Sequence, residues 1–121
     1  VYDGSVMFTK DMFMGGSDTL QCLSFQLKKR LPIGRGGMIL TNDKAAYEWL
    51  KLASYDGRDL NTYYPEDDFS VLGWHYYMTP EDAARGLLLF NQLPDENPNT
   101  GNDSKYTDLS TKEVFKQFTV E

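Results

Sequence analysis

The chain has 121 residues, of which 40% are hydrophobic and 25% are charged, and this is the size and composition of one ordinary soluble domain. Twelve Lys and Arg residues against eighteen Asp and Glu residues give a net charge of −6, so the overall field repels nucleic acid and anionic membrane surfaces. A single cysteine and a single histidine exclude a disulfide scaffold and a zinc site of Cys and His ligands, and the lone thiol fits the reducing cytoplasm. The apolar runs are far shorter than the roughly 20 residues that cross a bilayer, which excludes a transmembrane helix.

The first residues predict the end of a strand followed by a long loop. Residues 1–3 (VYD) run directly into a turn at Gly4, with neither a start methionine nor a signal peptide, so we expect the chain to be a piece of a longer protein. Residues 4–19 have no sustained hydrophobic period, which predicts a loop with at most one short element at Val6–Phe8. Loops of this length usually carry function.

Two short apolar runs predict buried strands, at Leu20–Phe25 and at Gly37–Thr41. After the second run, apolar side chains recur at helical spacing over residues 43–54, and either Asn42 or Asp43 can cap this helix. The order strand, strand, helix indicates an α/β layer, although three candidate strands are few for a complete sheet.

Residues 55–78 are rich in tyrosine and tryptophan and show no regular period, which predicts an ordered aromatic loop that buries against a partner. A second helix follows, because Thr79 is a suitable cap, Pro80 suits the first helical position and Pro94 ends the pattern.

The last part of the chain divides at its change of composition. Residues 94–110 contain few apolar side chains and many turn formers, which predicts a loosely tied linker. Residues 111–121 form a C-terminal segment, which we expect to be helical because apolar residues recur at helical spacing after a capping-box pattern at Ser110 and Glu113.

The segment Ser24–Gly37 combines groups that suit a phosphate-bearing cofactor: a hydroxyl at a strand end, then Lys28 and Lys29, then a glycine turn. The lysines precede the glycines, which is not the order of a P-loop, so we do not expect a nucleoside triphosphate site. From the residues alone, the lysines can equally be solvated charges and the glycines can simply reverse the chain.

This segment resembles the signature of the DegT/StrS sugar-aminotransferase family, in which Ser-Phe-His-x-x-Lys is followed after four residues by Gly-x-Gly-Gly. Counting forward from Ser24 and backward from the glycines both place the family's cofactor-binding lysine at Lys29. The resemblance continues through GGMILTND at 36–43 and through residues 73–93, and it spans roughly residues 1–93.

The resemblance implies an α/β fold, that of the fold-type-I, aspartate aminotransferase-like enzymes that use pyridoxal 5'-phosphate. Residues 1–93 would form part of the cofactor-binding large domain of such an enzyme. The implied reaction transfers an amino group from an amino acid to a nucleotide-linked keto sugar, in a homodimer with its sites at the subunit boundary. The alternative is a non-catalytic remnant or interaction module with the same fold.

The resemblance also assigns site residues. Lys29 is implied as the catalytic amine that binds the cofactor's aldehyde and later carries a proton, and Arg30 and Lys28 are nearby cations that would favour its neutral form. Asp3 is implied as the partner of the pyridine nitrogen and Ser24 as a donor to the cofactor phosphate. His75 stands where the family has Asn and would reach the phosphate of the neighbouring subunit's cofactor. No metal ligand is implied.

Several of these residues also have simpler interpretations. Asp3 precedes a glycine at a strand end, where an aspartate commonly forms a turn. His75 lies among aromatic residues and is compatible with a packed structural role. Cys22 fits a small buried hydrophobic residue, and the acidic residues 66–68 fit a solvated surface.

Overall fold

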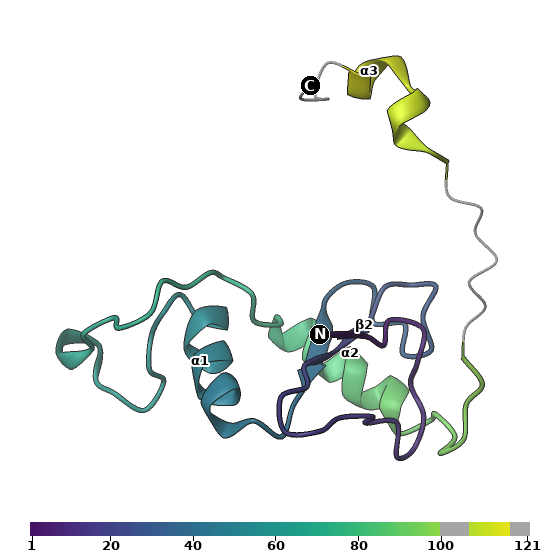
Figure 1. Ribbon diagram of the computed structural model, residues 1–121. Coiled ribbons are helices and arrows are strands. Elements are labelled where there is room, and N and C mark those ends of the chain that lie inside the picture. The colour runs from purple at the N-terminus through teal and green to yellow at the C-terminus, as the bar shows by residue number, and fades with distance from the viewer. Residues whose placement is uncertain (100–106, 117–121) are drawn as a thin grey trace.

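The computed structural model describes residues 1–99 and 107–116. Its centre is a three-stranded sheet, in which β2 (Gln21–Ser24) pairs in parallel with β1 (Tyr2–Asp3) and antiparallel with β3 (Gly37–Leu40). Figure 1 shows helix α2 passing behind β2 and helix α1 standing to one side. The strands predicted over residues 20–25 and 37–41 are therefore present, each slightly shorter than expected, but β3 is mostly exposed and not the buried strand that its apolar run predicted.

The strand β2 has one buried and one open face, because side chains alternate along a strand. Gln21 and Leu23 are buried, whereas Cys22 and Ser24 are partly exposed on the other face. The register pairs Asp3 with Cys22, so the side chains of Asp3, Cys22 and Ser24 lie on the same face of the sheet.

A small hydrophobic core lies between the loop that follows β2 and helix α2 (Pro80–Phe90). Three side chains of that loop region form its centre, each at most 5% exposed: Phe25, Leu31 and Ile33. Partly buried apolar side chains from other segments pack around them: Phe8, Met78 and Leu89. This packing joins the amino-terminal loop, the loop after β2 and α2 into one unit.

Helix α1 (Lys44–Ser54) begins where the sequence predicts, and the structure decides between its two possible caps. The carboxylate of Asp43 accepts hydrogen bonds from the main-chain N–H groups of Ala45 at 2.9 Å and Ala46 at 3.1 Å. Asp43, rather than Asn42, therefore satisfies two of the N–H groups that the first turn of a helix leaves unpaired.

Helix α2 starts as predicted, with the Thr79 hydroxyl accepting a hydrogen bond from the Asp82 N–H and with Pro80 as its first residue. The helix ends at Phe90, however, and not at Pro94. The chain between them continues in tighter turns, in which the Gln92 N–H donates to the Leu89 carbonyl and the Leu93 N–H donates to the Phe90 carbonyl, both at 3.1 Å.

The loop over residues 4–19 contains no regular strand or helix. The short element expected at Val6–Phe8 is a turn, closed by the Met7 N–H donating to the Gly4 carbonyl at 2.9 Å. Further along, the buried Gln21 side chain clamps the loop to the sheet, since its amide donates to the Met12 carbonyl and accepts from the Met14 N–H.

The aromatic loop over residues 55–78 is irregular, as predicted, except for one 3₁₀ turn at Tyr64–Glu66. Its second half is tied to the end of α1, because the Trp74 N–H donates to the Ala53 carbonyl at 2.7 Å. At the base of the loop the backbones of Gly57 and Gly73 touch, and a Cβ atom on Gly73 would collide with the Gly57 nitrogen.

The first part of the predicted linker is fixed to the body of the protein, which corrects the expectation of a loose tether over its full length. The Lys10 N–H donates to the Asp95 carbonyl at 2.7 Å, and the Arg30 Nε donates to the Pro98 carbonyl at 2.6 Å. The composition did not reveal these contacts because the linker contributes main-chain carbonyls to them and not apolar side chains.

The described C-terminal residues form two short helical turns, Leu109–Thr111 and Glu113–Lys116, and Asp108 caps the first of them. The helix expected over residues 111–121 is thus seen in part, and residues 100–106 and 117–121 lie outside the described residues. The predicted boundaries at residues 93 and 110 stay predictions. Across residues 1–99 and 107–116, no helix has the length and apolar character that crossing a membrane requires.

Candidate active site

Three of the four predicted site residues lie around the end of β2. Asp3 is the last residue of β1, Ser24 is the last residue of β2 and faces the same side, and Lys29 follows in the turn after β2. Lys29 is partly buried, whereas the neighbouring Lys28 is exposed. The structure therefore brings an acid, a hydroxyl and an amine to one region of the sheet.

Asp3 forms the turn that its position before Gly4 predicts. Its Oδ1 atom accepts a hydrogen bond from the Ser5 N–H at 2.9 Å, which is an Asx turn. The pKa of Asp3 is lowered, mainly by this main-chain hydrogen bond, next by the Ser5 side chain, and also by the positive charge of Lys29, while partial burial opposes the shift. Asp3 is therefore an ionised carboxylate that lies within the electrostatic reach of Lys29.

Ser24 has a hydroxyl that can still donate. Its Oγ atom accepts from the Gln26 N–H at 3.4 Å, which leaves the hydroxyl hydrogen itself for another acceptor. On the neighbouring strand Gly37 is the residue opposite Ser24. A Cβ atom on Gly37 would collide with the Leu23 carbonyl oxygen, so a glycine is required for the two strands to approach as they do.

Lys29 lies on a loop that is closed at its base. The Phe25 N–H donates to the Gly36 carbonyl at 3.0 Å, and the Gly34 N–H donates to the Phe25 carbonyl at 2.8 Å. Gly34 and Gly36 have φ angles of 126° and 82°, a backbone conformation that favours glycine. The glycine turn thus reverses the chain and returns it to β3.

Arg30, predicted as a cation beside Lys29, is held by the predicted linker. Its Nε atom donates to the Pro98 carbonyl at 2.6 Å and its guanidinium also reaches the Asn99 carbonyl at 3.4 Å. The partners are neutral carbonyl groups, so the positive charge of Arg30 is not neutralised by them and remains next to the turn that carries Lys29.

His75, the fourth predicted residue, lies in the aromatic loop, where it forms an isolated antiparallel bridge with Tyr55. Its Nδ1 atom is 3.4 Å from Oδ2 of Asp56, and its ring centre is 4.0 Å from that of Tyr77. The His75 side chain is 68% exposed, which does not fit a packed structural histidine. It lines a cavity of about 610 Å³, together with the glycine turn and the start of α2.

Tyr77, whose ring packs against His75, also lies near acidic, basic and tyrosine side chains. The pKa of Tyr77 is raised by partial burial, then by the negative charge of Asp56 and by Tyr55, while Arg58 acts in the opposite direction. Tyr77 is therefore a neutral phenol near physiological pH.

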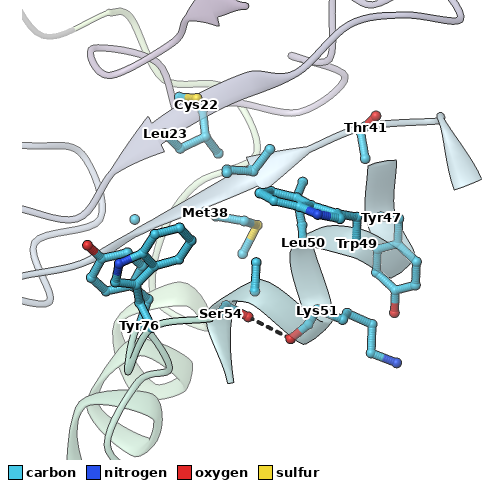
Figure 2. A pocket seen from close by; sticks show the side chains of 14 residues that line it. Cys22, Leu23, Met38, Thr41, Tyr47, Trp49, Leu50, Lys51, Ser54 and Tyr76 are labelled. Carbon is cyan, nitrogen blue, oxygen red and sulfur yellow. Dashed lines mark hydrogen bonds between the residues drawn. The ribbon is translucent and has the colours of Figure 1, made fainter. Parts of the chain in front are cut away.

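A second, apolar cavity of about 600 Å³ lies between β3 and α1 (Figure 2). Its lining includes Cys22 from β2, Met38 from β3, and Trp49 and Leu50 from α1. Cys22 is thus not the fully buried residue that the sequence suggested, since it is partly exposed. The helical spacing of Trp49 and Leu50 predicted an apolar face, but not that part of this face would remain open.

The sequence reasoning missed the residue that fixes the predicted acid. Ser5 holds Asp3 by its main chain and its side chain, and the signal for this was the sequence Asp-Gly-Ser, which is typical of an Asx turn. The sequence analysis also missed the ion pair between Nε of Arg35 and Oδ2 of Asp82, which are 2.8 Å apart, because the two residues are far apart in the sequence.

The residues around the end of β2 fit the chemical groups of pyridoxal phosphate. An ionised carboxylate suits a protonated pyridine nitrogen, a primary amine suits an aldehyde, and a hydroxyl that can donate suits a phosphate. Asp3, Lys29 and Ser24 supply these three groups. Over residues 1–99 and 107–116 there is no cluster of three or more His, Cys, Asp or Glu side chains placed to hold a metal ion.

Comparison with known proteins agrees with the resemblance in the sequence. The model of the DegT/DnrJ/EryC1/StrS aminotransferase family matches residues 7–106. A GDP-perosamine synthase from Escherichia coli O157:H7 is 33% identical over 86 residues, which is 71% of this chain and 23% of that protein. The chain thus spans less than a quarter of the length of this relative. No solved structure gives a significant match.

Proposed function

This chain belongs to the DegT/DnrJ/EryC1/StrS aminotransferase family, and on that premise we propose that it is part of a pyridoxal-phosphate-dependent sugar aminotransferase. The reaction would transfer an amino group from an amino acid to a nucleotide-linked keto sugar, a substrate class consistent with the name of the E. coli relative. Residues 1–93 would contribute to the cofactor-binding large domain, with residues 94–110 as a linker and residues 111–121 as a further segment.

Each proposed role follows from a chemical property of the residue. Pyridoxal phosphate supplies an aldehyde and a ring that accepts the electron pair left when a proton leaves the substrate. Asp3, ionised and fixed by Ser5, would hold the ring nitrogen in its protonated form. Ser24 would donate to the phosphate, and the Nζ atom of Lys29 would first hold the cofactor and then move the proton between carbons.

The observation that carries this proposal is the placement of Asp3 and Ser24 on one face of the sheet, at the ends of neighbouring strands, with Lys29 in the turn that follows. The positive charge of Lys29 is also the last of the causes that lower the pKa of Asp3. Lys29 is partly buried while Lys28 is exposed, so the lysine that matches the family's position is also the one that the fold shelters.

We also propose that the protein works as a cytoplasmic homodimer in which His75 reaches the cofactor phosphate of the partner subunit. The exposed position of His75, with 68% of its side chain accessible, supports a role outside its own core. The aromatic loop around it presents large apolar side chains to solvent, including Tyr63, Leu72 and Tyr76, each at least 70% exposed. Such surfaces commonly bury against a partner.

The test is chemical labelling of the lysine. The protein is incubated with pyridoxal phosphate and reduced with borohydride, and the pyridoxyl mass is located by peptide fragmentation. We expect the label on Lys29, a yellow colour before reduction, and loss of both in Lys29→Ala. The matched control Lys28→Ala should keep both, since Lys28 is the exposed neighbour. A label on Lys28, or on neither lysine, would instead support the non-catalytic remnant.

A further inference from the structure

His75 and Asp56 are brought together by main-chain pairing between the residues that end α1 and the second half of the aromatic loop. The Trp74 N–H donates to the Ala53 carbonyl at 2.7 Å, and the Asp56 N–H donates to the Trp74 carbonyl at 3.0 Å. Tyr55 and His75 face each other in an antiparallel bridge. The backbone therefore places Asp56 beside His75, although the two residues are far apart in the sequence.

Asp56 has a backbone conformation that is uncommon for a residue other than glycine. Its φ angle is 58°, in the left-handed region, where aspartate and asparagine are enriched. Such conformations persist where the surrounding structure determines them. Here the bond from Asp56 to Trp74 is joined by a bond from the Gly57 N–H to the Leu52 carbonyl at 2.9 Å. The position of the Asp56 backbone beside His75 is thus fixed from both sides of the residue.

The Asp56 carboxylate lies next to one particular nitrogen of the imidazole. Its Oδ2 atom is 3.4 Å from Nδ1 of His75, and the ring centre of Tyr77 is 4.0 Å from that of His75. These two contacts restrict the orientation of the imidazole. His75 lines the cavity beside the glycine turn, whereas Asp56 does not. Because Nδ1 is the nitrogen next to Asp56, Nε2 is the nitrogen that remains for a ligand.

A carboxylate beside Nδ1 influences where the neutral imidazole carries its hydrogen. The neutral ring has one N–H group, and its other nitrogen has a lone pair that accepts hydrogen bonds. A negative charge at 3.4 Å attracts an N–H group and repels a lone pair. The hydrogen is therefore favoured on Nδ1 of His75, and the lone pair is favoured on Nε2.

Two sets of charged and titratable groups surround His75. Arg35 and Asp82 line the same cavity, and they pair with each other at 2.8 Å. The groups that act electrostatically on the neighbouring Tyr77 phenol are Asp56, Tyr55 and Arg58. The Asp82 carboxylate already has a cation as its partner, so the Asp56 carboxylate is the one that acts on the His75 ring.

From these contacts we infer that Asp56 is a positioning residue for His75: its carboxylate keeps the imidazole hydrogen on Nδ1, so that Nε2 is the nitrogen that meets a phosphate group. When the ring is neutral, Nε2 can donate to a phosphate only after it has taken a proton from solution, and Asp56 then balances the charge of the imidazolium. Phosphate binding at His75 is therefore coupled to proton uptake. The inference rests on the proposed function for the identity of the phosphate, but the place of the hydrogen can be measured without cofactor.

The experiment reads the hydrogen directly, because His75 is the single histidine of the chain. The nitrogen chemical shifts of its side chain are measured by NMR in the cofactor-free protein, at a pH well above about 6.5, where a histidine ring is neutral. In the wild type we expect the shift of a hydrogen-bearing nitrogen at Nδ1 and of a bare nitrogen at Nε2. Asp56→Gly, which keeps the left-handed backbone, should move the two shifts toward each other. The control Asp68→Gly removes the same charge from an exposed position of the same loop and should leave both shifts unchanged.

Inorganic phosphate is the probe for the proton uptake. When it is added to the wild type at the same pH, the Nε2 shift should move to that of a hydrogen-bearing nitrogen. Asp56→Gly should need about threefold more phosphate for the same change, the size of effect that a solvent-exposed ion pair provides. If Asp56→Gly does not fold, Asp56→Asn gives the same test, because asparagine tolerates the left-handed backbone and carries no charge.

Identical nitrogen shifts in the wild type and in a folded Asp56→Gly or Asp56→Asn protein would overturn the role of Asp56. A wild-type Nε2 shift that does not respond to phosphate would overturn the proton uptake. The failure of the proposed function has a different signature, namely absence of the pyridoxyl label from Lys29 in the wild type. A label on Lys29 together with unchanged His75 shifts in the variants would refute the role of Asp56 alone.

Discussion

The Nε atom of Arg35 lies 2.8 Å from Oδ2 of Asp82, and this ion pair connects the glycine turn after Lys29 with the first turn of α2. The hydrogen bond from Arg35 is the main cause of the lowered pKa of Asp82, the Thr79 side chain contributes less, and partial burial opposes the shift. The connection can therefore be detected through its dependence on pH.

Replacing Asp82 by Asn should lower the melting temperature at pH 7, with a difference from the wild type that disappears in acid. The folded-state pKa of Asp82 lies below the ordinary value of 3.8, so its contribution to stability is present above pH 3.8 and is lost as the pH falls through the folded-state pKa. Thermal unfolding followed by circular dichroism between pH 7 and pH 2 would show this.

The neighbouring Glu81→Gln substitution is the matched control for Asp82→Asn. Both residues lie in the first turn of α2 and both interact with the helix dipole, but only Asp82 pairs with Arg35. A loss of stability in Asp82→Asn that is the same at every pH, or that Glu81→Gln reproduces, would count against the ion pair as the cause.

Leu31→Ala should destabilise the protein by about 2–5 kcal/mol, because Leu31 is 5% exposed and belongs to the core below the Lys29 turn. Leu27→Ala, in the same loop, is the control, since Leu27 is 65% exposed and should change the free energy of unfolding by no more than about 0.5 kcal/mol. Urea unfolding of the two variants measures the difference. Equal effects would show that the loop is not anchored by its core-facing side.

Gln21→Leu should destabilise the protein by about 1–3 kcal/mol, since it keeps the approximate side-chain size but leaves the Met12 carbonyl and the Met14 N–H without their partner. Hydrogen exchange at the Met14 amide should become faster. Gln26→Leu is a suitable comparison because Gln26 is exposed. Unaltered protection at Met14 would contradict the proposed clamp.

Asp43→Ala should cost about 0.5–2 kcal/mol, because both N–H groups that its carboxylate accepts from belong to the first turn of α1. The same change at Asn42 should have little effect. Far-UV circular dichroism and thermal unfolding distinguish the two. A larger loss for Asn42→Ala would transfer the capping role to the preceding residue.

The sequence predicted those features that depend on neighbouring residues. The start of α2 follows from Thr79 and Pro80, whose effects are confined to one helical turn, and the strand β2 follows from a run of bulky residues. The turn at Asp3 could also be predicted from the sequence, because an aspartate before a glycine commonly bonds to the main chain of its own segment.

The features that the sequence did not predict depend on long-range contacts. The pairing of Arg35 with Asp82 and the bond from Arg30 to the Pro98 carbonyl connect segments that are distant in the chain. Likewise, neither the burial of Ile33 against Gly86 nor the exposed position of His75 can be derived from local periodicity. For these residues only the folded arrangement provides the information.

The contact between Gly57 and Gly73 has a consequence for engineering. Because the two backbones meet without side chains, residues 58–72 form a loop whose ends are already close in space, as in an Ω-loop; we call these residues the cassette. A short linker could replace the cassette without moving the end of α1, while the two glycines themselves admit no substitution. Loops of other sequences could therefore be grafted at this position.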